Sequence, residues 1–93
     1  MHIGILTLQF HLEGCASLKE KRKRLSGLRD RFGRKTSIAV CEYGCQDAWQ
    51  KAEWGFVAAA SSRSAVKGLI DNIEREVSEN FDGRIVERQV EML

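Results

Sequence analysis

Residues 17–33, SLKEKRKRLSGLRDRFG, combine a helix-capping signal with a dense cluster of positive charge. Ser17 is a favourable N-cap residue, and Glu20 three positions later can complete a capping box. Leucine and phenylalanine then recur at positions 18, 25, 28 and 32, which form one apolar stripe on a helix. Gly33 is suited to end that helix. The stretch therefore predicts an amphipathic helix over 18–32 with a strongly basic outer face.

Periodic patterns on both sides of this helix predict four strands and a second helix. Apolar and polar residues alternate along 2–12, with Leu6, Leu8, Phe10 and Leu12 on one face, and further strands are expected over 36–43, 49–60 and 85–92. The second helix follows Ser61, Ser62 and Ser64, and its stripe contains Val66, Leu69, Ile70, Ile73 and Val77. The element order predicts an α+β, ferredoxin-like βαββαβ sandwich. Its four-stranded antiparallel sheet should have the order 4-1-3-2, with both helices on one face.

This topology brings distant segments to one end of the sheet. Right-handed crossovers make the first two strands parallel, with the third antiparallel between them. The start of the basic helix, residues 14–22, should then lie near the loop over 42–49. The turn at 80–83 should lie at the same end.

Length and composition narrow the class of protein. Ninety-three residues predict a single domain over 1–93, and 43% hydrophobic with 30% charged residues is typical of a globular chain. No apolar run approaches the roughly 18 residues that span a bilayer, and no signal-peptide pattern precedes the first strand. We therefore expect a cytoplasmic protein with no membrane association.

The three cysteines indicate neither a disulfide framework nor a metal site. Their number is odd, which favours free thiols in a reducing compartment. Cys41 and Cys45 could supply only two of the four ligands that structural zinc requires. We expect no metal or other cofactor, and we expect Cys41 to be a small buried residue in a strand.

Charge is segregated along the chain. Residues 17–35 hold nine Lys/Arg and two acidic residues, a net +7, whereas the rest holds six basic and eleven acidic residues, a net −5. Cations in the first turn of a helix also oppose the helix dipole, whose positive end favours anions. This pattern predicts a polyanionic partner. Glu42 or Asp47 could instead neutralise the cluster within the protein.

Lys21 and the aromatic pair Trp54 and Phe56 each allow more than one interpretation. Lys21 falls inside the apolar stripe of the basic helix, so its stem could cover the edge of the core while the ammonium reaches water, or the ammonium could meet a bound anion or a loop carboxylate. Trp54 and Phe56 share one strand face. They could form an RNA-stacking platform, but such a pair more often belongs to the core or to a dimer interface.

Sequence motifs give little support for catalysis. The chain contains no Gly-rich phosphate loop, GxSxG, HExxH or CxxC motif. A Cys45–His11 nucleophile–base pair is conceivable, but nothing in the spacing brings the two together. Glu42 and Asp47 could form an acid–base pair, although carboxylates beside a turn are more commonly caps or ion-pair partners. We expect a protein that is not an enzyme.

Two motifs together resemble the YlxP-like family of small bacterial proteins. They are the run SLKEKR over 17–22, preceded by Gly14, and the stretch QDAWQ over 46–50. The resemblance extends over essentially the whole chain and implies a ferredoxin-like fold. The family's genes often lie near those for translation initiation and ribosome assembly, which implies a role with RNA. The sequence differs from the family at Cys45, where histidine is frequent, at Cys15-Ala16, and at Glu13, where proline is frequent.

These observations lead to a non-catalytic binding module for RNA or a ribosomal subunit. The predicted phosphate contacts are Lys19, Lys21, Arg22, Lys23 and Arg24. The predicted loop of the same site comprises Glu42, Gln46, Asp47, Trp49 and Gln50. Alternatives are a homodimer formed through the open sheet face, without nucleic-acid binding, and an enzyme acting on a small anionic substrate.

Overall fold

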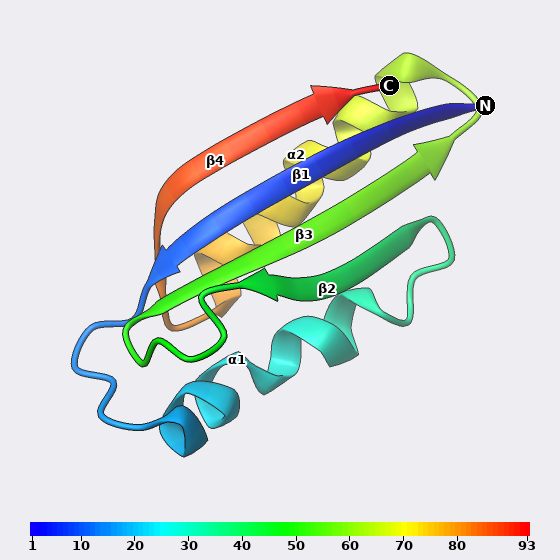
Figure 1. Ribbon diagram of the computed structural model, residues 1–93. Coiled ribbons are helices and arrows are strands. Elements are labelled where there is room, and N and C mark those ends of the chain that lie inside the picture. The colour runs from blue at the N-terminus through cyan, green and yellow to red at the C-terminus, as the bar shows by residue number, and fades with distance from the viewer.

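The computed structural model describes residues 1–93 and contains six elements in the predicted order (Figure 1). They are β1 (His2–His11), α1 (Leu18–Phe32), β2 (Ile38–Gly44), β3 (Lys51–Ala60), α2 (Arg63–Asn80) and β4 (Arg84–Met92). The bounds of α1 are those expected from its capping sequence and apolar stripe. The strands differ from the predicted ranges by one or two residues at their ends.

The four strands form one antiparallel sheet in the order β2-β3-β1-β4. β1 pairs with β3 and with β4, and β2 pairs with β3 on the other edge. Both helices lie on the same face of the sheet, with α2 behind β1 and β3 and α1 beneath β2 (Figure 1). The predicted ferredoxin-like sandwich is therefore confirmed.

The core lies between the sheet and the two helices. Leu6, Leu8 and Phe10 of β1 are fully or almost fully buried on the helix-facing side, as their alternation predicts. Trp54 and Phe56 of β3 also face the helices and are 4% and 0% exposed. Their burial places them in the core and removes them as an open stacking platform.

Hydroxyl side chains begin both helices. Ser17 accepts a hydrogen bond from the backbone N–H of Glu20, and Ser62 accepts one from that of Ala65. The Glu20 carboxylate also reaches back, but it accepts from the N–H of Ala16 at 2.7 Å instead of from the N-cap residue. The capping interaction is therefore shifted by one residue from a standard capping box.

The prediction that Cys41 is buried is wrong. Cys41 is exposed, because Ile38 faces the helices and strand alternation then turns Cys41 to the open face; the fully buried cysteine is Cys15, in the loop before α1. In β4, Val86 is 49% exposed. A register shift between Gln9 and Phe10 pairs Phe10 with Ile85, so the alternation of β4 is interrupted at Val86.

No helix covers the second face of the sheet (Figure 1). Ile3 and Ile5 are half-buried there, and Val57 beside them is 39% exposed. Neither α1 nor α2 combines the length and the apolarity that crossing a bilayer requires.

Candidate binding groove between helix 1 and the loop after strand 2

Lys21 is almost completely buried at the first turn of α1, with 3% of its surface exposed. Its ammonium donates to the carbonyl oxygens of Cys45 at 2.7 Å and Ala48 at 2.9 Å. The Glu42 carboxylate lies 3.6 Å away and provides the opposite charge. Of the two interpretations of Lys21, the one in which its ammonium reaches water is therefore wrong, and the one in which it meets a loop carboxylate is confirmed. The ammonium has three protein partners instead of being free for an RNA phosphate.

Strand alternation explains why Glu42 reaches Lys21. Glu42 lies on the same side of β2 as Ile38, and it is the cross-strand partner of Trp54. A carboxylate on the helix-facing side of a sheet needs a compensating charge. Lys21 supplies it from the position in the apolar stripe of α1 that faces this strand.

Hydrogen bonds hold the loop between β2 and β3 against Lys21 and against the end of β1. Cys45 adopts a left-handed backbone conformation, with φ of 56°, and its carbonyl accepts both the Lys21 ammonium and the N–H of Ala48. The Gln46 amide donates to the Glu42 carbonyl at 3.3 Å. The loop is tied to the end of β1 because Leu12 donates its N–H to the carbonyl of Gln50 at 2.9 Å. The predicted neighbourhood of residues 14–22 and 42–49 is therefore confirmed.

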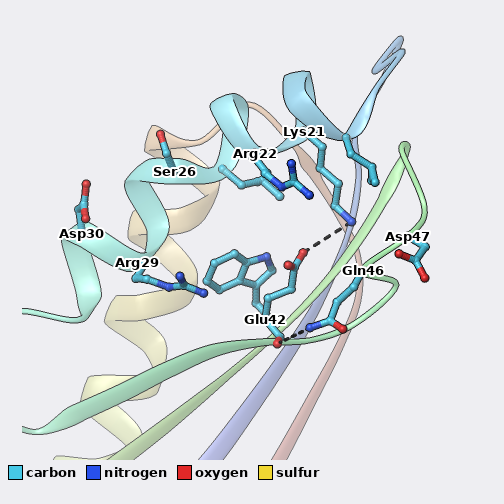
Figure 2. Close-up of a pocket in the computed structure, with 11 residues that line it drawn as sticks. Lys21, Arg22, Ser26, Arg29, Asp30, Glu42, Gln46 and Asp47 are labelled. Carbon is cyan, nitrogen blue, oxygen red and sulfur yellow. Dashed lines mark hydrogen bonds and ion pairs between the residues drawn. The ribbon is translucent and has the colours of Figure 1, made fainter.

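A groove of about 540 Å³ opens between α1 and this loop (Figure 2). Such a volume lies within the range of small-molecule and nucleotide sites. Arg22 and Arg29 extend from α1 toward Glu42, whereas Ser26 and Asp30 point outward in Figure 2. The apolar part of the lining comes from Leu18, Leu25 and Trp54.

Charge is divided between the two walls of the groove. The α1 wall provides the guanidinium groups of Arg22 and Arg29, and neither has a carboxylate within ion-pair distance. The opposite wall provides Glu42, Gln46 and Asp47. The Arg29 guanidinium carbon lies 5.9 Å from the centroid of the Trp54 ring, a cation–π contact. The groove is thus cationic on one side and rich in hydrogen-bond acceptors on the other.

The five predicted phosphate contacts have different environments. Lys19, Arg22 and Lys23 are exposed on α1. Lys21 is internal, as described above, and Arg24 is only 14% exposed. Arg24 donates to the carbonyls of Glu13 and Asp82, and its Nε lies 3.1 Å from the Asp82 carboxylate. Arg24, like Lys21, is therefore corrected from a candidate phosphate contact to a residue that joins α1 to its neighbouring loops.

The predicted loop residues are also divided by the structure. Glu42, Gln46 and Asp47 line the groove, but Trp49 and Gln50 do not. Trp49 is 52% exposed. Sequence reasoning missed Arg29, although its spacing of seven from Arg22 places both on one helix face.

The candidate catalytic pair is not joined in the structure. His11 lies 3.3 Å from the Glu13 carboxylate, and the thiol of Cys45 accepts from the Gln9 amide at 3.9 Å. No hydrogen bond connects His11 with Cys45 or Glu42 with Asp47. No group of three or more His, Cys, Asp and Glu side chains is arranged to hold a metal ion.

Two solved structures share the overall fold of this chain. It superimposes on protein YJCS with a TM-score of 0.63 at 12% identity, covering 96% of each chain. A putative chlorite dismutase gives a TM-score of 0.64 at 9% identity, covering 99% of this chain and 44% of the other. At these identities the similarity concerns the fold alone.

Sequence comparison then identifies the family. The model described as "Protein of unknown function (DUF503)" matches residues 3–90, so the chain belongs to this family. The "Uncharacterized protein YlxP" of Bacillus subtilis (strain 168) is 36% identical over 61 residues, which make up 66% of each chain. The family resemblance indicated by residues 17–22 and 46–50 is therefore confirmed.

Proposed function

We propose that the protein is a non-catalytic RNA-binding module that holds single-stranded RNA along the exposed face of α1. The observation that supports this proposal is a set of cations without ionic partners. Four of the nine Lys/Arg side chains over 17–35 form ion pairs, namely Lys21, Arg24, Arg31 and Lys35. The other five have no carboxylate within 4.0 Å: Lys19, Arg22, Lys23, Arg29 and Arg34.

A polyanion accounts for this pattern better than a single small anion does. Lys19, Arg22 and Lys23 lie in the first turns of α1, and Arg29 and Arg34 lie at and beyond its other end. A helix rises about 1.5 Å per residue, so these charges extend along roughly 20 Å. A phosphate backbone can contact charges spaced in this way, and the groove beside them provides room for a base.

The proposal predicts salt-dependent binding that depends on the position of the charges. A labelled single-stranded RNA dodecamer should bind at low salt, and its affinity should fall as salt rises, with a slope of roughly 0.7 per phosphate contact. Arg22→Glu/Lys23→Glu should reduce that slope by about 1.4 because two contacts are lost. Fluorescence anisotropy between low and moderate salt measures both quantities.

Arg63→Glu/Lys67→Glu provides the matched control. These two side chains are exposed on α2 and have no ion-pair partner. The control changes the net charge by the same amount at a different surface. Equal weakening by both double variants, or no binding of RNA at low salt, would contradict the proposal.

A second candidate function is self-association through the open sheet face. Val57 and Tyr43 are 39% and 55% exposed, and half-buried Ile3 and Ile5 lie on the same uncovered face. An exposed apolar sheet surface is a common site of association. A homodimer should then appear in light scattering and dissociate in Val57→Glu. A strictly monomeric protein at high concentration would rule this candidate out.

A further inference from the structure

The groove beside α1 contains a buried hydrogen-bond donor with no acceptor in the protein. Trp54 is 4% exposed and lines the groove, and its indole Nε1 has no hydrogen-bond partner. Buried donors in native proteins almost always have a partner. A ligand in this groove should therefore present a hydrogen-bond acceptor to Trp54.

The Glu42 carboxylate lies on the groove wall beside Trp54 and accepts hydrogen bonds, so the same ligand should also present hydrogen-bond donors. Glu42 is the cross-strand neighbour of Trp54, so its carboxylate and the indole lie on the same side of adjacent strands. Lys21 holds Glu42 in place, since its ammonium is fixed by two backbone carbonyls and lies 3.6 Å from the carboxylate. An ionised carboxylate can only accept hydrogen bonds, and it can accept two adjacent N–H groups at once.

The arginines on the α1 wall favour a ligand with a flat ring, which a guanidinium can stack against, and with a negatively charged backbone. Guanidinium planes provide stacking surfaces for nucleic-acid bases, and Arg29 already lies against the Trp54 ring. Arg22 has no carboxylate partner and extends into the same groove (Figure 2). A base stacked at Arg29 with its phosphate near Arg22 would use both cations.

We infer that the groove binds one guanine base of the RNA held on α1. The inference rests on the proposed function and specifies which base the site selects. Guanine has two adjacent donors, N1–H and N2–H, next to the O6 acceptor on its Watson–Crick edge. The two donors match the Glu42 carboxylate, and O6 matches Trp54 Nε1. Adenine, cytosine and uracil lack two adjacent donors on that edge.

Trp54 allows the inference to be tested by fluorescence. The chain has two tryptophans, so Trp49→Phe leaves Trp54 as the only one. The probes are a uridine dodecamer and three dodecamers with one central guanosine, adenosine or cytidine. The guanosine probe should bind this variant roughly tenfold more tightly than the other three, as expected for one bidentate contact. It alone should change the emission of Trp54.

Substitutions at the groove separate this contact from general RNA binding. Glu42→Gln should remove the preference for guanosine while leaving the affinity for the uridine probe within about twofold, because the phosphate contacts remain. Asp71→Asn, a charge-matched control that is exposed on α2 and lies outside the groove, should preserve the preference. Arg29→Gln changes an exposed residue, so it tests stacking without disturbing the core, and should weaken the guanosine probe roughly tenfold.

Each outcome distinguishes the two proposals. If no dodecamer binds at low salt, the proposed function fails and the inference fails with it. If all four probes bind with the expected salt dependence but equal affinity, the guanine site is wrong and the RNA-binding proposal stands. Unfolding measurements on Glu42→Gln check its fold. An unchanged guanosine preference in Glu42→Gln, or an unchanged affinity for the guanosine probe in Arg29→Gln, would also overturn the inference.

Discussion

Lys21 and Glu42 each break the pattern of their own element, and each compensates for the other. Lys21 occupies a buried position of the α1 stripe, and Glu42 occupies a helix-facing position of β2. Without Glu42 the buried Lys21 ammonium would have no ion-pair partner, and without Lys21 the half-buried Glu42 carboxylate would have none. Together with the Cys45 and Ala48 carbonyls, they form a polar contact that fixes the loop against the helix. This contact also shapes one end of the groove.

We predict that Lys21→Met lowers the free energy of unfolding by roughly 2–4 kcal/mol. The substitution leaves two carbonyls without their donor and the Glu42 carboxylate without its cation. Lys19→Met, at an exposed position of the same turn, should change stability by less than about 0.5 kcal/mol. Urea unfolding of both variants measures the difference. Equal effects would show that the burial of Lys21 has no energetic consequence.

At the scale of elements, polar side chains cap the start of α1 and join its first turns to neighbouring loops. Ser17 and Glu20 satisfy backbone N–H groups there, and Arg24 bridges to the loops at Glu13 and Asp82. The positive charges of the first turn oppose the helix dipole, so these contacts compensate for an unfavourable placement. The placement of the groove and of the exposed cations therefore depends on the N-terminal cap.

We predict that Ser17→Ala destabilises the protein by about 1 kcal/mol, because the Glu20 N–H loses its acceptor. Ser26→Ala is the control, since Ser26 is exposed in the middle of α1 and should change stability by less than about 0.5 kcal/mol. Thermal or urea unfolding compares them. A loss in Ser26→Ala as large as that in Ser17→Ala would argue against a specific capping effect.

At the scale of the whole molecule, Glu76 links the two helices. Its carboxylate on α2 lies 3.6 Å from Arg31 of α1 and 3.3 Å from Lys35 just beyond α1. Burial raises the pKa of Glu76, but the hydrogen bonds and positive charges of Arg31 and Lys35 outweigh burial and lower the pKa below its ordinary value of 4.5. Glu76 thus neutralises Arg31 and Lys35 near the C-terminal end of the basic segment, whereas Lys19, Arg22 and Lys23 at its start have no carboxylate partner.

This link predicts a pH-dependent contribution to stability. Because the pKa of Glu76 is lowered in the folded protein, its contribution is fully present above the unfolded-state pKa and is lost as pH falls through the folded-state pKa. Glu76→Gln should therefore cost up to about 1 kcal/mol near neutral pH, and the difference from wild type should vanish in acid. Urea unfolding from neutral pH to below pH 4 tests this expectation.

Glu79→Gln provides the control for that series. Glu79 lies exposed on the same helix and forms no ion pair. Its substitution should have little effect at any pH. A constant cost for Glu76→Gln across the whole pH range would contradict the expected linkage.

The sequence by itself determined the fold and the position of its unusual charge. The alternation along β1, the stripe and cap of α1, and the element order were sufficient for the antiparallel sheet and the helix-covered face, because burial of one face fixes each period locally. The topology expected from the element order also predicts that the start of α1 lies beside the loop after β2. The burial of single residues was harder to predict, as Cys41 shows, because a shift of one register position reverses the face on which a strand side chain lies.

Only the tertiary structure decided which cations are free. Lys21, Arg22, Lys23 and Arg24 are four consecutive cations, and only Lys21 stands out in the sequence, by its place in the apolar stripe. In the structure Lys21 and Arg24 contact partners from distant segments, whereas Arg22 and Lys23 lie exposed on the helix surface. The same holds for Trp54, whose buried indole N–H beside Glu42 follows from the pairing of β2 with β3. Such properties depend on contacts between residues 11 to 58 positions apart, which local periodicity does not encode.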